Sequence, residues 1–265
     1  MRLSISSWTL HGVIGAGTSL LQIPAQIATH GIHTLEVCHF HLLSVTPEYL
    51  AEFRAALQAA DVELYSVLID SGDITARDAA TLEEDLQFIR HWIDVASELG
   101  AKCVRIDAGL QPPTPEIVQV SAANLAVLAA YAASRNVKVI TENWHATSRE
   151  PVPLLEILDR CEGHVGLCAD LGNAEGPNKY ETLGMLLPRA TSIHFKVRYD
   201  AAGQIEPTDF AHCVQLIESS GFDGPMSIIY NETDREWAAV DQLREAITGT
   251  FSGLMAPPPI FRSRV

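Results

Sequence analysis

The chain has 265 residues, 47% of them hydrophobic, and a mean hydropathy of +0.11, which is enough to bury one large core. Its formal net charge of −15 repels phosphate backbones and anionic lipids, so we expect neither nucleic acid nor a membrane among its partners. The five cysteines form no CxxC pair and the first residues do not resemble a signal peptide, so we expect a cytoplasmic protein without disulfides.

Short β-branched or apolar runs alternate with longer helical patterns along the whole chain. Each run has the length and composition of a buried strand. The eight predicted strands are Leu3–Thr9, His33–Phe40, Val62–Asp70, Ala101–Gly109, Val137–Asn143, His164–Gly172, Ala190–Arg198 and Pro225–Asn231.

The segments between these runs carry apolar residues at helical spacing. Within residues 82–100 this spacing predicts a helix that ends at Gly100, and within residues 124–136 it predicts one that ends at Asn136. Within residues 209–224 it predicts a helix that ends at Gly221, and a last helix is expected over residues 235–247. Eight strands that are each followed by a helix predict a single (β/α)8 TIM barrel, a closed parallel barrel of α/β class.

A doubly wound open sheet is the alternative fold. It usually has a glycine-rich phosphate turn after its first strand, but residues 12–17 (GVIGAG) lack a full GxGxxG motif and are expected to form a loop. We assign residues 1–250 to the barrel and 251–265 to a proline-rich tail, which we expect to pack on the outside or on a partner subunit of a possible homodimer.

Alternation along the strands places ionisable groups inside the barrel. In SIHFKVR, for example, Ile193, Phe195 and Val197 share the face that packs under the helices, so His194 and the residues at the same spacing face inward. Isolated buried charges are costly, so several that converge at the end of a barrel indicate a site. The inward set is Glu36, Arg105, Asp107, Glu142, Asp170, His194, Lys196 and Arg198.

Three of these groups form a candidate metal site. Glu142, Asp170 and His194 come from three successive strands and supply two carboxylates and an imidazole. That mixture suits a divalent metal ion (Mn, Mg, Co or Zn) and leaves positions open for water and substrate. A structural ion network is the alternative.

The second half of the chain resembles a known family. Glu142 in ITENWH, Asp170 in ADLGN, His194 in HFK, and the run GFDGPMSI resemble the xylose-isomerase-like TIM barrels, which include ketose 3-epimerases, dehydratases and abasic-site endonucleases. The resemblance implies that Glu142, Asp170 and His194 bind metal and that Glu142 is also the catalytic base.

The resemblance also suggests which residues surround the substrate. Lys196 corresponds to the lysine of the seventh strand and is expected to be catalytic, and Arg105 corresponds to the arginine of the fourth. The full set expected to contact substrate is Trp8, Glu36, Arg105, His145 and Arg198. His39 and His41 are expected at the surface or the rim of the substrate pocket.

Two positions depart from the family pattern. Many members carry Glu on the eighth strand, where SIIYNE here has Ile229, and many carry His where this chain has Asn173. The predicted function is a metal-dependent isomerase or epimerase acting on a small sugar, keto-sugar or polyol through proton abstraction and a metal-stabilised enediolate. A dehydratase (lyase) of the same family and a non-catalytic sugar-binding barrel are the alternatives, because Ile229 removes one of two possible bases. The acidic charge disfavours the endonuclease activity.

Overall fold

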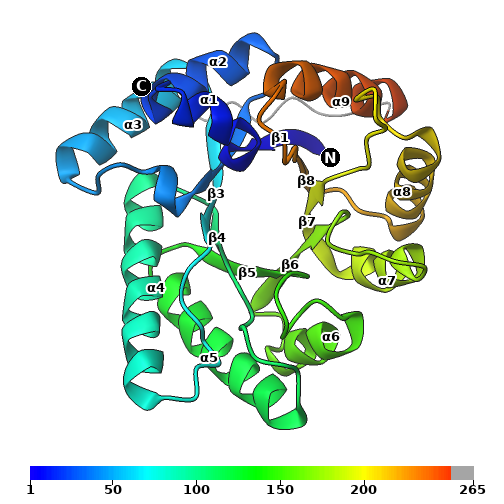
Figure 1. Cartoon of the computed structure of the whole chain (residues 1–265). Helices are drawn as coiled ribbons and strands as arrows, with labels where there is room; N and C mark the ends of the chain where they lie inside the picture. The colour runs from blue at the N-terminus through cyan, green and yellow to red at the C-terminus, as the bar shows by residue number, and fades with distance from the viewer. Residues whose placement is uncertain (252–265) are drawn as a thin grey trace.

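A computed structural model describes residues 1–251 and shows a closed barrel of eight parallel strands. Each strand pairs with the next in the chain, and β8 pairs with β1 to complete the ring (Figure 1). The predicted (β/α)8 TIM barrel is therefore confirmed. The strands are β1 Arg2–Ser6, β2 Thr34–Cys38, β3 Glu63–Ile69, β4 Cys103–Ile106, β5 Lys138–Glu142, β6 Val165–Asp170, β7 Ala190–Phe195 and β8 Pro225–Ile228.

Within the described residues, each strand is followed by one helix of the outer ring, and a short helix α1 precedes the first of them. Figure 1 shows this ring surrounding the strands. The helices are α1 His11–Gly15, α2 Ile23–Thr29, α3 Pro47–Ala59, α4 Ala79–Leu99, α5 Pro115–Ala133, α6 Pro151–Arg160, α7 Lys179–Leu186, α8 Pro207–Ser220 and α9 Glu236–Thr250.

Helix ends follow local chemistry visible in the sequence. Gly100 and Gly221 end α4 and α8 in the left-handed conformation, with φ of 78° and 71°, which glycine adopts without a steric penalty. At the start of α4, the carboxylate of Asp78 accepts a hydrogen bond from the amide of Thr81. The two glycine stops were predicted correctly, whereas α5 ends at Ala133, before the expected Asn136.

Most strands are shorter at their carboxyl ends than we expected. The first strand ends at Ser6, and the segment up to Leu10 is a 3-10 helix. Residues 12–17 were expected to form a loop, but helix α1 takes up the first part of them. The seventh strand ends at Phe195, so strand alternation does not extend to Lys196 and Arg198. The boundaries were wrong because sequence alternation continues into the loops that leave the barrel.

The faces of the strands divide as the alternation predicted. Ile193 and Phe195 are buried in the core between barrel and helices, and Val197, two residues beyond the end of β7, is buried there too. The barrel interior holds a smaller cluster in which Cys103, Ile140 and Cys168 pack together with Tyr65. All five cysteines are free, as expected.

Helix α5 is the one described helix long and apolar enough to cross a membrane by composition alone. It belongs to the ring around the barrel and buries residues such as Leu125 and Leu128, which accounts for its apolar character. The predicted tail at 251–265 lies, except for Phe251, outside the described residues, so that prediction is untested.

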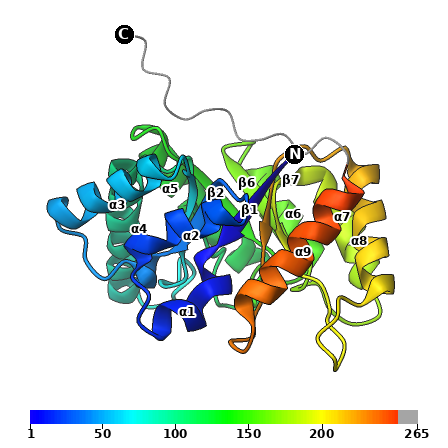
Figure 2. The ribbon, with the colours of Figure 1, turned by 90° about the horizontal axis from the view of Figure 1, so that it is seen from above.

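In the side view, the chain start lies at one end of the barrel, and the loops that follow the strands lie at the other (Figure 2). Active sites of TIM barrels lie at the end where the strands terminate. The polar side chains at that end therefore define the candidate site.

Candidate active site

A cavity of about 260 Å³ opens at the carboxyl ends of the strands. Residues from almost every strand end contribute to it, as in barrel enzymes generally. Its lining consists of Ser6, Trp8, Cys38, Leu68, Asp70, Arg105, Glu142, Trp144, Asp170, Asn173, His194, Lys196, Ile229 and Asn231.

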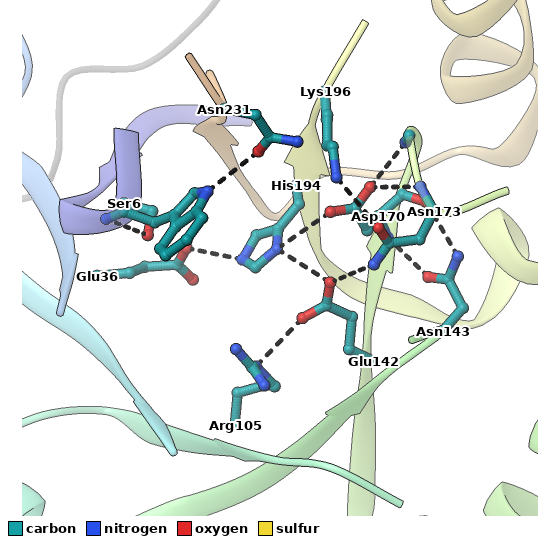
Figure 3. Close-up of polar contacts among 12 residues, drawn as sticks. Ser6, Glu36, Arg105, Glu142, Asn143, Asp170, Asn173, His194, Lys196 and Asn231 are labelled. Atoms are coloured by element: carbon teal, nitrogen blue, oxygen red, sulfur yellow. Dashed lines mark hydrogen bonds and ion pairs between the residues drawn. The ribbon is translucent and has the colours of Figure 1, made fainter. Parts of the chain in front are cut away.

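His194 lies at the centre of a group of carboxylates (Figure 3). Its Nε2 atom is 3.1 Å from Glu36 Oε2, and its Nδ1 atom is 3.4 Å from Glu142 Oε1 and 3.6 Å from Asp170 Oδ2. Burial opposes the charged imidazole, but Cys168 and the surrounding carboxylates outweigh burial and hold the pKa of His194 well above its usual value. These surroundings therefore favour a positive charge at His194.

Asp170 is held by the backbone around it. Its Oδ1 atom accepts hydrogen bonds from the amides of Gly172 at 2.7 Å and Asn173 at 2.8 Å. Burial raises the pKa of the Asp170 carboxyl, but His194, Lys196 and the amide of Asn173 lower it below its usual value overall. Asp170 therefore stays ionised with its Oδ2 atom toward His194.

Asn173 links the predicted base to the predicted catalytic lysine. Its Nδ2 atom donates to Glu142 Oε1 at 2.9 Å, and its Oδ1 atom accepts from Lys196 Nζ at 3.2 Å. This amide therefore connects the two side chains (Figure 3). The sequence drew attention to Asn173 only as a departure from the family pattern and did not suggest this role.

Arg105 forms the floor of the cavity on the β4 side. Its guanidinium pairs with Asp70, with Asp107 at 2.7 Å and with Glu142 Oε2 at 3.1 Å. Burial would lower the pKa of Arg105, but these carboxylates raise it well above its usual value. The guanidinium also lies 5.1 Å from the ring of Trp144, so it is fixed from several sides.

The donor set at His194 fits a divalent cation. Three carboxylates surround a single imidazole, and two of them, Glu142 and Asp170, lie on its Nδ1 side. A cation at Nδ1 would replace the imidazole proton, and a proton retained on Nε2 would still donate to Glu36.

Cys168 is a fourth possible ligand that the sequence analysis missed. One ligand atom from each of Glu142, Cys168 and His194 lies within 4.8 Å of the others. Carboxylate oxygens are the ligands that Mg²⁺ and Mn²⁺ prefer, whereas a thiolate suits softer metals such as Zn²⁺. We therefore favour Asp170 as the third ligand. Cys168 could have been found from the sequence, because it lies two residues before Asp170 and shares its inward face.

The side of the cavity at β8 and β1 carries no charge. Ile229 follows β8, and the indole of Trp8 donates from Nε1 to Asn231 Oδ1 at 3.0 Å. Trp8 is 36% exposed and stacks on His11, so part of its ring faces the cavity opening. These residues offer apolar surface and an amide but no base.

The structure brings most predicted site residues together. Trp8, Arg105, Glu142, Asp170, His194 and Lys196 all line the cavity. Glu36 lies behind His194, and His145 lies beside the cavity, with Nε2 3.4 Å from Asp107 Oδ2. That contact with Asp107 raises the pKa of His145.

Arg198 and two histidines lie apart from the cavity. Arg198 is exposed and lines a different hollow beside α7. His39 and His41 were expected at the surface or pocket rim, which is wrong, because they are only 6% and 8% exposed. His41 Nδ1 is hydrogen-bonded to the Ser7 hydroxyl at 2.8 Å, so it is part of the packed structure.

Comparison with known proteins identifies relatives by fold. The structure resembles the probable 3-DHS dehydratase AsbF from Bacillus anthracis (14% identity, TM-score 0.73, 93% of this chain and 99% of that chain). It also resembles a D-allulose 3-epimerase from Methylomonas sp. in complex with D-allulose (17%, 0.72, 95% and 97%). A third neighbour is a xylose isomerase-like TIM barrel protein from Mycobacterium smegmatis in complex with magnesium (16%, 0.67, 89% and 89%).

No curated protein matches the sequence. The family model described as xylose isomerase-like TIM barrel matches residues 24–248, from α2 into α9. This range includes every charged residue of the candidate site. The chain belongs to the xylose isomerase-like TIM barrel family.

Proposed function

We propose that this protein is a metal-dependent enzyme that moves a proton at the carbon next to the carbonyl of a small keto-sugar or polyol-derived ketone, with Glu142 as its single base. The observation that carries this proposal is the one-sided arrangement of the acids. The ionisable groups lie at the ends of β2 to β7, whereas Ile229 follows β8, which lies across the barrel from β4.

Glu142, Asp170 and His194 would hold the cation, and Glu36 would orient His194. A divalent cation bound there supplies Lewis-acid stabilisation of the negative charge that develops on the carbonyl oxygen as the proton leaves. Arg105 and Asn173 fix the two oxygens of Glu142 from opposite sides, at 3.1 Å and 2.9 Å. The base is therefore held in position before the substrate arrives.

Glu142 would accept the proton and return it on the same face. Positioned acid–base catalysis contributes about 10²–10⁴-fold to a rate. Inversion of a stereocentre needs a second group on the opposite face, where the cavity offers Ile229, Trp8 and Asn231. The geometry therefore supports isomerisation over two-base epimerisation.

Dehydration is the second candidate, and Lys196 favours it. Its Nζ atom is 3.2 Å from Asn173 Oδ1, which places an amino group beside the base. After Glu142 removes the proton, Lys196 could donate a proton to a departing β-hydroxyl group, which leaves as water. The dehydratase among the structural neighbours supports the same alternative.

Proton exchange with solvent tests the proposal. The protein, loaded with Mn²⁺ or Mg²⁺, is incubated with ketoses in D₂O, and loss of the α-proton signal is followed by NMR. We expect exchange in the wild type and in the exposed-surface control Glu218→Gln, and a decrease of about 10²–10⁴-fold in Glu142→Gln. Release of water from the product would identify the dehydratase. Sugar binding with no exchange would contradict the proposal and indicate a binding protein.

A further inference from the structure

A second cavity, of about 490 Å³, adjoins the catalytic one. It lies between the loop after β7 and the loop after β8, which project from the same end of the barrel (Figure 2, yellow and orange). Lys196, Ile229 and Asn231 line both cavities and form the boundary between them. Together the two volumes fall within the roughly 300–1,000 Å³ range of small-molecule sites.

Aromatic rings and a fixed guanidinium build the walls of this second cavity. The rings of Tyr199 and Tyr230 lie 5.2 Å apart and nearly perpendicular, and the Arg235 guanidinium is 5.4 and 5.6 Å from them. Gly203, with a φ of +73°, brings its backbone so close to Arg235 that a Cβ would overlap the guanidinium. The loop therefore packs on Arg235 and holds it in place.

Two polar groups of this wall have no partner within the described part of the chain. The hydroxyl of Tyr199 and the Nη2 atom of Arg235 are buried and form no hydrogen bond there. The neighbouring groups are already engaged, because Tyr230 donates to Asp234 at 2.7 Å and accepts from Arg235 Nε at 3.2 Å. Unpaired buried polar groups are costly, so both groups would gain a partner if the side chains of Tyr199 and Arg235 turned toward a hydrogen-bonding ligand in the cavity that they line.

The charge of the cavity indicates that this ligand is neutral. Its lining has two cationic side chains, Lys196 and Arg235, and three carboxylates, from Asp200, Glu232 and Asp234, which leaves one net negative charge. The amides of Ala202 and Gln204 already donate to Asp200, so the loop does not present them to an anion. A phosphate group is therefore disfavoured.

We propose that this cavity is a subsite for a second, neutral sugar ring, so that the substrate is a disaccharide in which this ring is linked through a hydroxyl group of the keto-sugar and the keto group in the catalytic cavity stays free. An aromatic ring that packs on the apolar side of a sugar, here the half-buried Tyr199, together with a few polar groups, is the chemistry that such a sugar requires. This inference rests on the proposed function, because it places the ketone at Glu142.

Saturation-transfer NMR on the metal-loaded protein tests the subsite independently of turnover. The probes are D-fructose and a set of glucosyl-fructoses that keep a free keto group and differ in linkage. We expect at least one disaccharide to show contacts from both rings and to bind on the order of tenfold more tightly than fructose. Tyr199→Ala and the space-filling Ala202→Trp should remove that advantage while fructose binding is unchanged, and Tyr131→Ala on α5 is the control.

The outcomes separate this inference from the proposed function. Contacts from both rings without α-proton exchange would support the subsite and contradict the proton-transfer proposal. Exchange of fructose without tighter binding of any disaccharide would overturn the subsite alone. Tighter binding of fructose 6-phosphate than of every disaccharide would also overturn it, because the subsite would then accept an anion.

Discussion

The two sides of the barrel mouth differ sharply in charge, and two buried histidines show the contrast. On the side of β4 to β7, carboxylates and Cys168 hold the pKa of His194 well above its usual value, although burial opposes the charge. Beside Trp8, where His41 is hydrogen-bonded to Ser7, burial lowers the pKa of His41 to about 4. The same type of side chain at the same end of the barrel thus has a raised pKa in one place and a lowered pKa in the other.

The difference indicates that the cost of burying charged groups falls mainly on the residues around His194 and Arg105. The interactions of Arg105, Glu142, Asp170 and His194 with one another offset the cost of removing each charge from water. The side with Trp8 and Ile229 presents no charged group to the cavity, so its side chains can pack as apolar surface. Substitutions on the two sides should therefore differ in how strongly they act and in which property of the protein they change.

The largest effect should follow loss of Arg105. In Arg105→Met, Asp70, Asp107 and Glu142 lose their shared cation while they stay buried, so we expect the free energy of unfolding to fall by about 3–5 kcal/mol. Urea denaturation measures this change. The control is Arg135→Met, which removes an exposed pair with Asp94 and should cost about 1 kcal/mol or less. Equal losses in both variants would contradict the contrast between buried and exposed charge.

A smaller effect is expected at Glu36, which contacts the predicted metal ligand His194 from behind. Glu36→Gln keeps the shape but weakens the hydrogen bond that orients the imidazole, so the affinity for Mn²⁺ should fall about 10–100-fold. Isothermal titration calorimetry measures the affinity. Glu63→Gln, a buried glutamate that pairs with Arg2, is the matched control and should leave the affinity unchanged. Unchanged metal binding in Glu36→Gln would exclude the orienting role.

On the neutral side, acid should destabilise the fold through His41. Its pKa is about 4 in the folded protein and near 6.5 when unfolded, so the unfolded chain binds more protons between these values. The contribution of neutral His41 to the free energy of unfolding is therefore fully present above pH 6.5. It is lost as the pH falls toward 4, and this loss lowers the free energy of unfolding by about 1–2 kcal/mol. Denaturation at several pH values should show a smaller decrease in His41→Gln. An identical pH dependence in the two proteins would contradict this assignment.

The smallest expected effect is a new minor product. Ile229→Glu places a second carboxylate where the neutral side meets the catalytic cavity, and it should allow some inversion at the carbon that Glu142 deprotonates. Chromatography of the reaction mixture should detect the epimer. Ile229→Gln has the same shape but accepts no proton, and it should form none. An epimer formed equally by the wild type would show that a second base already exists.

Strand alternation predicted the inward residues well where the chain is regular. Glu142, Asp170 and His194 lie at or next to the ends of strands, so their faces follow from the apolar residues beside them. Residues beyond the strand ends were less predictable, because loop backbones follow no fixed period. Lys196 lines the cavity through the loop after β7, whereas Arg198, two residues later, lies outside it.

Contacts between distant segments were beyond the reach of the sequence. The bridge from Lys196 through Asn173 to Glu142 joins three loops and strand ends, and its geometry depends on how the barrel closes. Asp70 was predicted only as the last residue of a strand, and its ion pair with Arg105 was not predicted. The cavity beside Tyr199 and Arg235 likewise requires two loops to be placed together.

Metal content tests the central claim most directly. Elemental mass spectrometry on the purified, metal-reloaded protein should find about one equivalent of Mn, Mg, Co or Zn in the wild type and in Cys168→Ala. It should find little in Glu142→Ala and His194→Ala, because each lacks a ligand of the proposed cluster. Metal retained in His194→Ala, or no metal bound by the reloaded wild type, would contradict a metal centre formed by Glu142, Asp170 and His194.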